Sequence, residues 1–383
     1  MEIRALKLQD VNYGGSWYSN VYDKWEYDDF KSDPEWKNGW ISMDCAYYNK
    51  DDDRVYLGIT CFNENGIFKA YDRKLDSFVD LGYEKIAKPF DAKFHRSLLK
   101  REKDGCLYGA VALLHCSDKQ FEAQGGSIIR YDPKTGEMKR IATPIPHTYI
   151  QAMVLDNERD LLFCQCFPPE YLISYNLETG EVKNYGLVGT GISGMAQGEN
   201  IELDEFKNLW GPWCLTRAWQ PAAGVDANRI FRLNAGEDKV DFLSTGLPKK
   251  DGSLGYNKIE GIFNFNDGYM YASGANGSIY RINTKTGYAA YLFTPVEDRN
   301  SRLASMKKGP DGYAYGIVGR DGKCELLRFD YKNTKYELLG QIIDKEGTPC
   351  YQIHDLVITD DMVIYACEND VPHRSGYLWE IKL

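Results

Sequence analysis

One short unit, a polar turn followed by a strand with an aromatic residue at a fixed place, recurs seven times along this chain of 383 residues. The copies read DDDRVY, KDGCLY, ERDLLF, FKNLW, NDGYMY, PDGYAY and DDMVIY, and end at Tyr56, Tyr108, Phe163, Trp210, Tyr271, Tyr315 and Tyr365. Successive copies lie 44 to 61 residues apart. Self-similarity at such a period is typical of repeat folds and propellers.

A second unit, strand–turn–strand, follows each copy, as in IIRYDPKTGEMKRI (128–141) and IYRINTKTGYAAYLF (279–293). Asp, Asn and Gly in its turns suit tight hairpins. Four short strands per unit predict an all-β fold, a seven-bladed β-propeller of four-stranded antiparallel blades. The last unit stops one strand short, so EIRALKL at the N-terminus is expected to supply its outer strand and cover that sheet edge. We therefore expect a single propeller domain over 1–383.

The composition of this chain restricts the classes of partner that it can bind. The net charge is −10 and no block of Lys or Arg occurs, which argues against nucleic acid or an anionic membrane as a partner. The opening MEIRALKLQD lacks the features of a signal peptide, and no apolar run is long enough to span a bilayer. The ten cysteines are scattered and expected to be reduced, buried small hydrophobes. We expect a cytoplasmic protein and leave its oligomeric state open.

Propeller topology predicts where a site would lie. The first strand of a blade begins, and its second strand ends, on one face of the disc, around the mouth of the channel. All five histidines fall at such positions: His95, His115, His147, His354 and His373. The same rule places Asp44 and Glu260 on this face. Each alone is readily a hydrogen-bonded structural residue. A polar, titratable cluster in a cleft nevertheless predicts a small-molecule or glycan site on this face.

The segment 13–40 is a long aromatic connection entering the first blade. It contains Trp17, Trp25, Trp36 and Trp40 with tyrosines between them, and its position predicts that it lies over the channel face. It is either a stacking platform for sugar rings or a plug over the channel mouth. Cys164 and Cys166 have the spacing of half a metal site, but no matching second pair exists, so a buried strand end is the favoured interpretation.

Blade two carries a family resemblance. FHRSLL and YGAVALLHC place His95 and His115 twenty residues apart, and PHTYIQAM and ENDVPHRSGYLWE follow in blades three and seven. These segments resemble the seven-bladed propeller polysaccharide lyases, namely the ulvan lyases and the L-rhamnose-α-1,4-D-glucuronate lyases, and a related propeller α-L-rhamnosidase family. The likeness spans most of the chain. It implies an enzyme that cleaves short uronic-acid-containing oligosaccharides by β-elimination, exo-acting on rhamnose–glucuronate linkages.

Elimination needs a group that neutralises the C6 carboxylate, a base for the C5 proton and an acid for the departing oxygen. The resemblance implies a histidine pair, a tyrosine and an arginine. His95 and His115 match the pair, and Tyr149 is the nearest tyrosine. Blade three has no arginine in CQCFPPEY, so carboxylate binding falls to another arginine or to a metal. The substrate-binding candidates are His147, Gln165, Arg217, Trp219, Glu260, Arg302, Arg320, His354, Glu368, Asn369 and Arg374.

No organic cofactor is expected, while a structural or catalytic divalent ion (Ca²⁺, Zn²⁺ or Mn²⁺) stays open. Three alternatives remain. A glycoside hydrolase needs two carboxylates, for which Glu260, Glu368 and Asp370 are candidates. A streptogramin-lyase-like propeller would eliminate from a cyclic peptide lactone. A binding propeller like the WD-repeat scaffolds needs no catalytic group, although this chain lacks recurrent GH and WD dipeptides.

Overall fold

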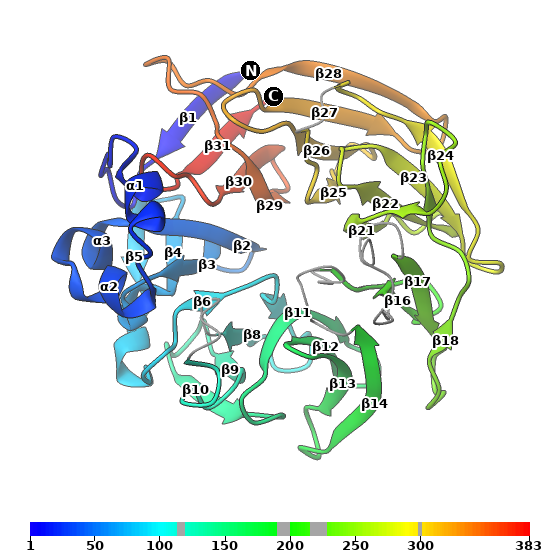
Figure 1. Cartoon of the computed structure of the whole chain (residues 1–383), viewed down its shortest axis with the longest axis horizontal. Coiled ribbons are helices and arrows are strands. Elements are labelled where there is room, and N and C mark those ends of the chain that lie inside the picture. The colour runs from blue at the N-terminus through cyan, green and yellow to red at the C-terminus, as the bar shows by residue number, and fades with distance from the viewer. Residues whose placement is uncertain (113–118, 190–199, 215–227, 298–300) are drawn as a thin grey trace. The chain divides into compact units, whose positions relative to one another are not determined.

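The computed structural model describes residues 1–112, 119–189, 200–214, 228–297 and 301–383. Seven antiparallel sheets follow one another along the chain, and the fold is a seven-bladed β-propeller with four-stranded blades, as predicted (Figure 1). The chain divides into two compact units. The first unit is Met1–Tyr149 with Arg320–Cys324 and Gln341–Leu383, and the second is Ile150–Gly319 with Glu325–Gly340.

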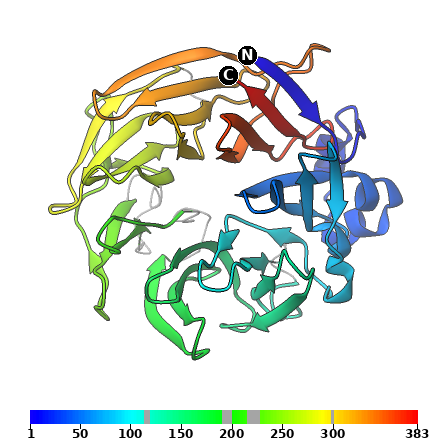
Figure 2. The same ribbon diagram turned by 180° about the vertical axis from the view of Figure 1, so that it is seen from behind.

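The first unit contains three of the sheets. One consists of β2 (Ile41–Asn49), β3 (Arg54–Cys61), β4 (Phe68–Asp72) and β5 (Ser77–Asp80). The next consists of β6 (Lys93–Phe94), β7 (Leu99–Lys100), β8 (Leu107–Ala112), β9 (Ser127–Tyr131) and β10 (Met138–Ala142). The third consists of β29 (Ile353–Ile358), β30 (Val363–Glu368), β31 (Leu378–Lys382) and β1 (Glu2–Leu6). The pairing of β1 with β31, visible from both sides in Figures 1 and 2, confirms the predicted closure.

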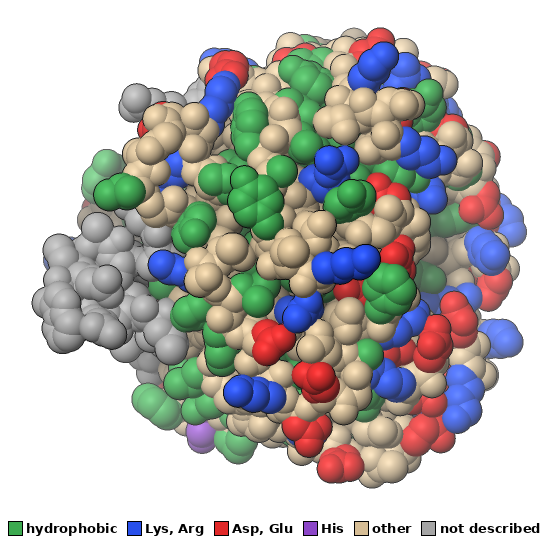
Figure 3. Space-filling view, turned by 90° about the vertical axis from the view of Figure 1, so that its right-hand side faces the viewer, with side chains coloured by type: hydrophobic (Ala, Val, Ile, Leu, Met, Phe, Trp, Pro, Cys, Tyr) green, Lys and Arg blue, Asp and Glu red, His purple; other side chains and the backbone are tan. Residues whose placement is uncertain are grey.

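The second unit contains the other four sheets. The first of them consists of β11 (Tyr149–Asp156), β12 (Leu161–Phe167), β13 (Glu170–Asn176) and β14 (Val182–Gly189), and the second of β15 (Glu202–Leu203), β16 (Leu209–Trp213), β17 (Arg229–Leu233) and β18 (Asp241–Phe242). The third consists of β21 (Ile259–Asn264), β22 (Tyr269–Gly274), β23 (Ile279–Asn283) and β24 (Ala289–Phe293). The fourth consists of β25 (Met306–Lys308), β26 (Ala314–Val318), β27 (Glu325–Asp330) and β28 (Lys335–Gln341). A small ribbon, β19 (Leu247–Pro248) with β20 (Tyr256–Asn257), lies outside them. On the face in Figure 3, acidic and basic side chains are interspersed.

The aromatic segment folds into three short helices, α1 (Ser16–Tyr22), α2 (Tyr27–Ser32) and α3 (Pro34–Gly39), beside the β2–β5 sheet (Figure 1). They are too short to show helical periodicity, so the sequence pattern did not predict them. Asp33 caps α3 by accepting the N–H groups of Glu35 and Trp36. The rings of Tyr13, Tyr27, Phe30, Trp36 and Trp40 pack with Phe62 and Ala92 into one buried cluster. Most of the aromatic surface of this segment is thus buried in packing between its own rings, which gives these rings a structural role.

The recurrent aromatic residue has a structural role. Four of the seven copies donate a tyrosine hydroxyl to the aspartate four residues earlier: Tyr56 to Asp52 (2.6 Å), Tyr108 to Asp104 (2.9 Å), Tyr271 to Asp267 (2.7 Å) and Tyr315 to Asp311 (2.6 Å). Trp210 donates its indole N–H to Asp204 in the same way (2.9 Å). Each bond joins the second strand of a sheet to the turn before it, and it satisfies a polar atom that the buried ring carries into the core.

The nine described cysteines are all buried, and none of them forms a disulfide. Burial raises the pKa of the Cys166 thiol to about 12, and that of its neighbour Cys164 rises as well. This pair behaves as the buried strand end that the sequence favoured. In the described parts of the chain, no helix is long and apolar enough to cross a membrane.

Candidate functional site

Four of the residues that the sequence placed on one face occupy irregularities in the first strand of a sheet. The pairing register shifts at Asp44 in β2, at Glu260 in β21 and at His354 in β29. In the second sheet, β6 and β7 both pair with β8, and the break between them contains His95. A bulge or break re-aims a side chain away from the regular alternation of a strand, and such irregularities are common beside active sites.

His95 and His354 form a buried pair in the first unit. Their Nε2 atoms lie 3.1 Å apart, their ring centroids 4.6 Å apart, and each side chain is 2% exposed. The Nδ1 atom of His354 lies 2.5 Å from the carbonyl oxygen of Asp44, so this nitrogen carries a proton and donates it. The Nε2 atom of His354 is therefore the acceptor, and the Nε2 atom of His95 is a donor.

Arg96 is the second donor to this acceptor. Its Nε lies 3.2 Å from Nε2 of His354, and its side chain is only half-buried. The backbone of Arg96 has a φ of 32°, which residues other than glycine rarely adopt. Asp370, at the end of β30, has a φ of 50°. Strained positions of this kind gather at functional sites. The sequence interpretation missed Arg96, although its place directly after His95 was a signal for it.

Asp44 brings a carboxyl group into the same region. Ser42 and Thr60 donate their hydroxyl groups to its two oxygens. Burial raises its pKa to about 7; nearby Lys93 opposes this shift, and Asp370 adds to it. This carboxyl group therefore changes its charge near neutral pH.

Hydrogen bonds extend the site along the ends of β29 and β30. Ser42 accepts the backbone N–H of Asp370 (3.0 Å), Asn369 donates to the Asp370 carboxylate (2.9 Å), and Gln352 donates to Asn369 (3.1 Å). We define the polar cluster as Asp44, Lys93, His95, Arg96, Gln352, His354, Asn369 and Asp370. These residues lie in or next to β2, β6, β29 and β30. Lys93, Arg96 and Gln352 were not among the residues predicted from the sequence.

Glu368 and Arg374 are predicted binding residues that the structure ties to each other. Two hydrogen bonds of 2.6 and 2.8 Å join the guanidinium to the carboxylate, and both side chains are buried. The Glu368 carboxylate also accepts the backbone N–H groups of Tyr351 and Tyr377. These contacts give the ion pair a structural role in holding the turn after β30.

The other predicted residues of the first unit are His147, Tyr149, Arg320 and His115. His147 is exposed, has a φ of 56°, and places Nδ1 2.8 Å from the carbonyl oxygen of Ala123. Tyr149 is buried at the start of β11. Arg320 is exposed. His115 of the predicted catalytic pair lies outside the described residues, so the partner that the structure gives to His95 is His354.

Two predicted groups belong to the second unit. Glu260 forms an ion pair with Arg302 at 2.6 Å and lies 3.9 Å from Lys258. Gln165 is fully buried at the end of β12, and neither its amide oxygen nor its amide nitrogen has a hydrogen-bond partner among the described residues. An orphaned buried amide is unusual and is consistent with a bound water or ligand group. Arg217 and Trp219 lie outside the described residues.

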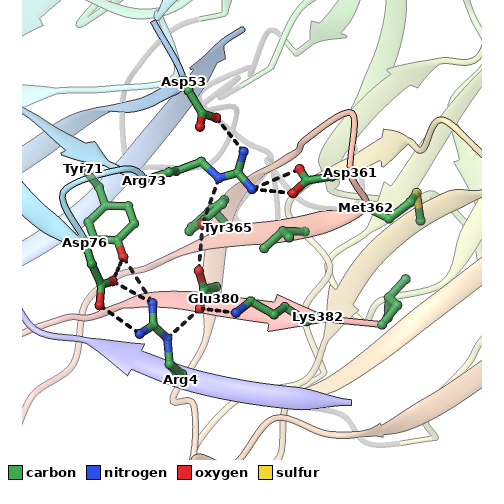
Figure 4. A pocket seen from close by; sticks show the side chains of 12 residues that line it. Arg4, Asp53, Tyr71, Arg73, Asp76, Asp361, Met362, Tyr365, Glu380 and Lys382 are labelled. Carbon is green, nitrogen blue, oxygen red and sulfur yellow. Dashed lines mark hydrogen bonds and ion pairs between the residues drawn. The ribbon is translucent and has the colours of Figure 1, made fainter.

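A polar cleft of about 560 Å³ opens elsewhere in the first unit, between β1, β30, β31 and the β4–β5 turn (Figure 4). Its charged side chains pair with one another. Arg4 contacts Asp76 and Glu380, Arg73 contacts Asp53 and Asp361, and Lys382 contacts Glu380. Because each cation already has a carboxylate, this cleft fits a structural network better than a ligand site. Among the described residues of the chain, no group of three or more His, Cys, Asp or Glu is arranged to hold a metal ion.

Comparisons with known proteins bear on the fold. No family model and no curated protein matches this sequence. Solved structures do match. A chain of the mitotic checkpoint complex aligns with a TM-score of 0.58 and 10% identity, covering 91% of this chain and 90% of that chain. The WD40 β-propeller domain of Doa1 aligns with a TM-score of 0.57 and 12% identity, covering 91% and 95%. At such low identity, the likeness shows the propeller fold alone.

Proposed function

We propose that this protein is a lyase that cleaves uronic-acid-containing oligosaccharides by β-elimination, exo-acting on linkages of the rhamnose–glucuronate type. The observation that carries the proposal is the His95–His354 pair with Arg96 beside it. The pair supplies a donor and an acceptor within one hydrogen bond of each other, and the arginine supplies a positive charge. These are the three groups that elimination next to a carboxylate requires.

The active form of the pair carries one extra proton, as His95 imidazolium and neutral His354. Nε2 of His354 takes the C5 proton of the uronate, and the C–H electron pair forms the C4–C5 double bond. The C4–O bond breaks, and Nε2 of His95 gives its proton to the departing oxygen. His354 then carries the extra proton. Transfer across the 3.1 Å that separates the two Nε2 atoms restores the starting form. The substrate enters as this hydrogen bond opens.

Arg96 takes the part of the arginine that blade three lacks. A guanidinium paired with the C6 carboxylate lowers the cost of the negative charge that develops when the C5 proton leaves. Its half-buried side chain already lies beside the histidine pair. The guanidinium of Arg374 forms two hydrogen bonds with Glu368. Asp44 positions His354, because its carbonyl oxygen holds the proton on Nδ1.

The glycoside hydrolase alternative has less support. It needs two carboxylates facing one bond. Of its three candidates, Glu260 and Glu368 are each held in an ion pair, and Asp370 is the one that lies in the polar cluster. The binding-propeller alternative is supported only by a likeness of fold. Ultraviolet absorbance separates elimination from the other two functions, since only elimination creates a conjugated double bond. Release of free sugar then separates a hydrolase from a binding propeller.

The test measures that absorbance for the purified protein on oligosaccharides of alternating rhamnose and glucuronate. Wild type is compared with His95→Gln, His354→Gln and Arg96→Met, and with Tyr288→Ala as a control at an exposed turn. We expect the rate at which absorbance rises to fall by at least about a hundredfold in each of the first three variants and to stay unchanged in the control. Thermal unfolding checks that each variant is folded. Release of free sugar without absorbance would identify a hydrolase, and silence in both assays would contradict enzymatic function on these substrates.

A further inference from the structure

One amide of the polar cluster carries a buried acceptor that no neighbouring group satisfies. The Gln352 side chain is 2% exposed, and its Nε2 atom donates to Oδ1 of Asn369 at 3.1 Å. Its Oε1 atom is buried and has no hydrogen-bond partner among the described residues. Burying an oxygen without a donor is costly, so an atom of this kind beside a candidate site points to a donor on a bound molecule.

The direction of the Gln352 amide is fixed by the residues that follow it in the network. A carboxylate only accepts hydrogen bonds, so the Asn369 amide turns its Nδ2 atom toward Asp370 (2.9 Å). Oδ1 of Asn369 therefore faces Gln352 and needs the NH2 group of that residue. Turning the Gln352 amide around would bring two carbonyl oxygens together. The atom left at the end of this chain of bonds is thus an oxygen, which can bind only a donor.

Gln352 lies on the same side of its sheet as the histidine pair. The N–H of Asn369 donates to the Gln352 carbonyl oxygen (3.3 Å), so the two residues continue the antiparallel pairing of β29 and β30, and their bonded amides share one side. Asn369 is two residues from Cys367, which packs on the same side against apolar residues of β2. His354 faces β2 as well, because its Nδ1 atom donates to the carbonyl oxygen of Asp44.

The unsatisfied oxygen is also close to the reacting groups along the chain. Gln352 precedes His354 by two residues, which is at most about 7 Å of extended chain. Ser42 of β2 closes the region from the other side, since its hydroxyl accepts the N–H of Asp370 and donates to Asp44 (3.3 Å). This spacing suits a single sugar ring, with its reacting carbon at His354 and a hydroxyl group at Gln352.

We propose that Gln352 is a specificity-determining residue, whose amide oxygen accepts a hydrogen bond from the C2 or C3 hydroxyl of the uronate ring at the histidine pair. This inference rests on the proposed function for its substrate. In the elimination, C4 loses the departing oxygen, C5 loses its proton, and Arg96 holds the C6 carboxylate. The hydroxyl groups at C2 and C3 are the donors that the reaction leaves unused. A ring without the matching hydroxyl is rejected, because the buried oxygen then stays without a donor.

The experiment compares the rhamnose–glucuronate disaccharide with two analogues, which lack the C2 or the C3 hydroxyl of the uronate ring. Calorimetry with the His95→Gln protein, the starting protein, gives affinities without turnover. Gln352→Met is added to it, because methionine keeps the length of the side chain and removes both polar atoms. Gln341→Met makes the same change at an exposed glutamine of the first unit and is the matched control.

We expect Gln352→Met to weaken binding of the disaccharide about tenfold, and one of the two analogues to bind the starting protein about tenfold more weakly than the disaccharide does. With that analogue, Gln352→Met should cause no further loss, because the hydrogen bond is already absent. The analogue that lacks the other hydroxyl should lose affinity on Gln352→Met as the disaccharide does. Gln341→Met should bind all three sugars as the starting protein does.

The outcomes separate this proposal from the proposed function. Loss of the Gln352→Met effect with one analogue supports the contact, even if no absorbance develops and the lyase activity fails. A purely structural role would weaken binding of all three sugars by the same factor, and an oxygen that holds only water would give no loss. Either result, or no binding to the starting protein, overturns the contact even if elimination is observed. Should Gln352→Met fail to fold, equal binding of the three sugars to the starting protein overturns it, and a tenfold loss with one analogue supports it.

Discussion

At the scale of single residues, the irregular positions of the first strands decide which side chains form the site. Regular β2 would turn Ser42 and Asp44 to one side and Met43 and Cys45 to the other. The register shift at Asp44 breaks this alternation, as does the one at His354 in β29. Both residues are polar and buried, and they meet through the bond between the Asp44 carbonyl oxygen and His354. The register shifts in β2 and β29 therefore lie where a hydrogen bond joins the two strands.

Asp44 gives a prediction for stability against pH. The unfolded chain ionises this carboxyl near its ordinary pKa of 3.8, whereas the folded protein keeps it protonated up to about pH 7. Between these values, the folded state holds the extra proton, so its stability falls as the pH rises and then levels off above pH 7. The loss amounts to about 4 kcal/mol at most.

We expect Asp44→Asn to remove most of this decline, because the amide stays neutral and still accepts from Thr60. The free energy of unfolding, measured in urea between pH 4 and pH 8, shows whether the decline is removed. Asp360→Asn, at an exposed turn, is the control and should follow the wild-type curve. Parallel curves for Asp44→Asn and wild type would contradict a buried carboxyl that is neutral below pH 7.

At the scale of elements, an Asp–x–x–x–Tyr turn precedes four of the seven second strands and is tied to each of them by a hydrogen bond. Tyr271 shows it clearly: its ring is 1% exposed, and its hydroxyl donates to Asp267 at 2.7 Å. Tyr271→Phe keeps the ring and deletes the bond to a charged acceptor, which we expect to cost about 1.5–3 kcal/mol of unfolding free energy. Tyr288→Phe removes an exposed hydroxyl and should cost nothing measurable. Equal stability of the two variants would show that the ring alone matters.

At the scale of the whole molecule, the sequence pattern predicted the blades because period and turn chemistry are local properties. The same holds for β1, whose role followed from counting strands in the last unit. The site was predicted only in part. Topology placed His95 and His354 at one end of their sheets, but the pairing partner of His95 depends on a bulge in β29 that no local pattern encodes. Arg96 follows His95 directly, which was a local signal for it, but its side-chain direction follows from the break between β6 and β7.

Closure of the last blade gives the final prediction. Arg4 on β1 bonds to Glu380 on β31 (2.6 Å) and to Asp76 in the β4–β5 turn (2.8 Å), so one side chain links the first strand, the last strand and the first blade (Figure 4). Glu380 is 5% exposed, and loss of Arg4 would leave its carboxylate buried with only Lys382 at 3.8 Å as a cation. Because Arg4 itself is partly exposed, we expect Arg4→Met to cost about 1–2 kcal/mol rather than the larger penalty of a fully buried pair.

The double variant Arg4→Met/Glu380→Gln tests the cause. If the cost of Arg4→Met comes from an uncompensated carboxylate, neutralising that carboxylate should recover part of the lost stability, as measured by urea unfolding at neutral pH. High salt should also narrow the difference between Arg4→Met and wild type, because it screens the partly exposed bond to Asp76. Additive losses in the double variant would mean that Arg4 acts through the packing of its aliphatic stem on β31. The closure would then depend on the backbone pairing of β1 with β31 and on apolar contact, with the ion pairs contributing little.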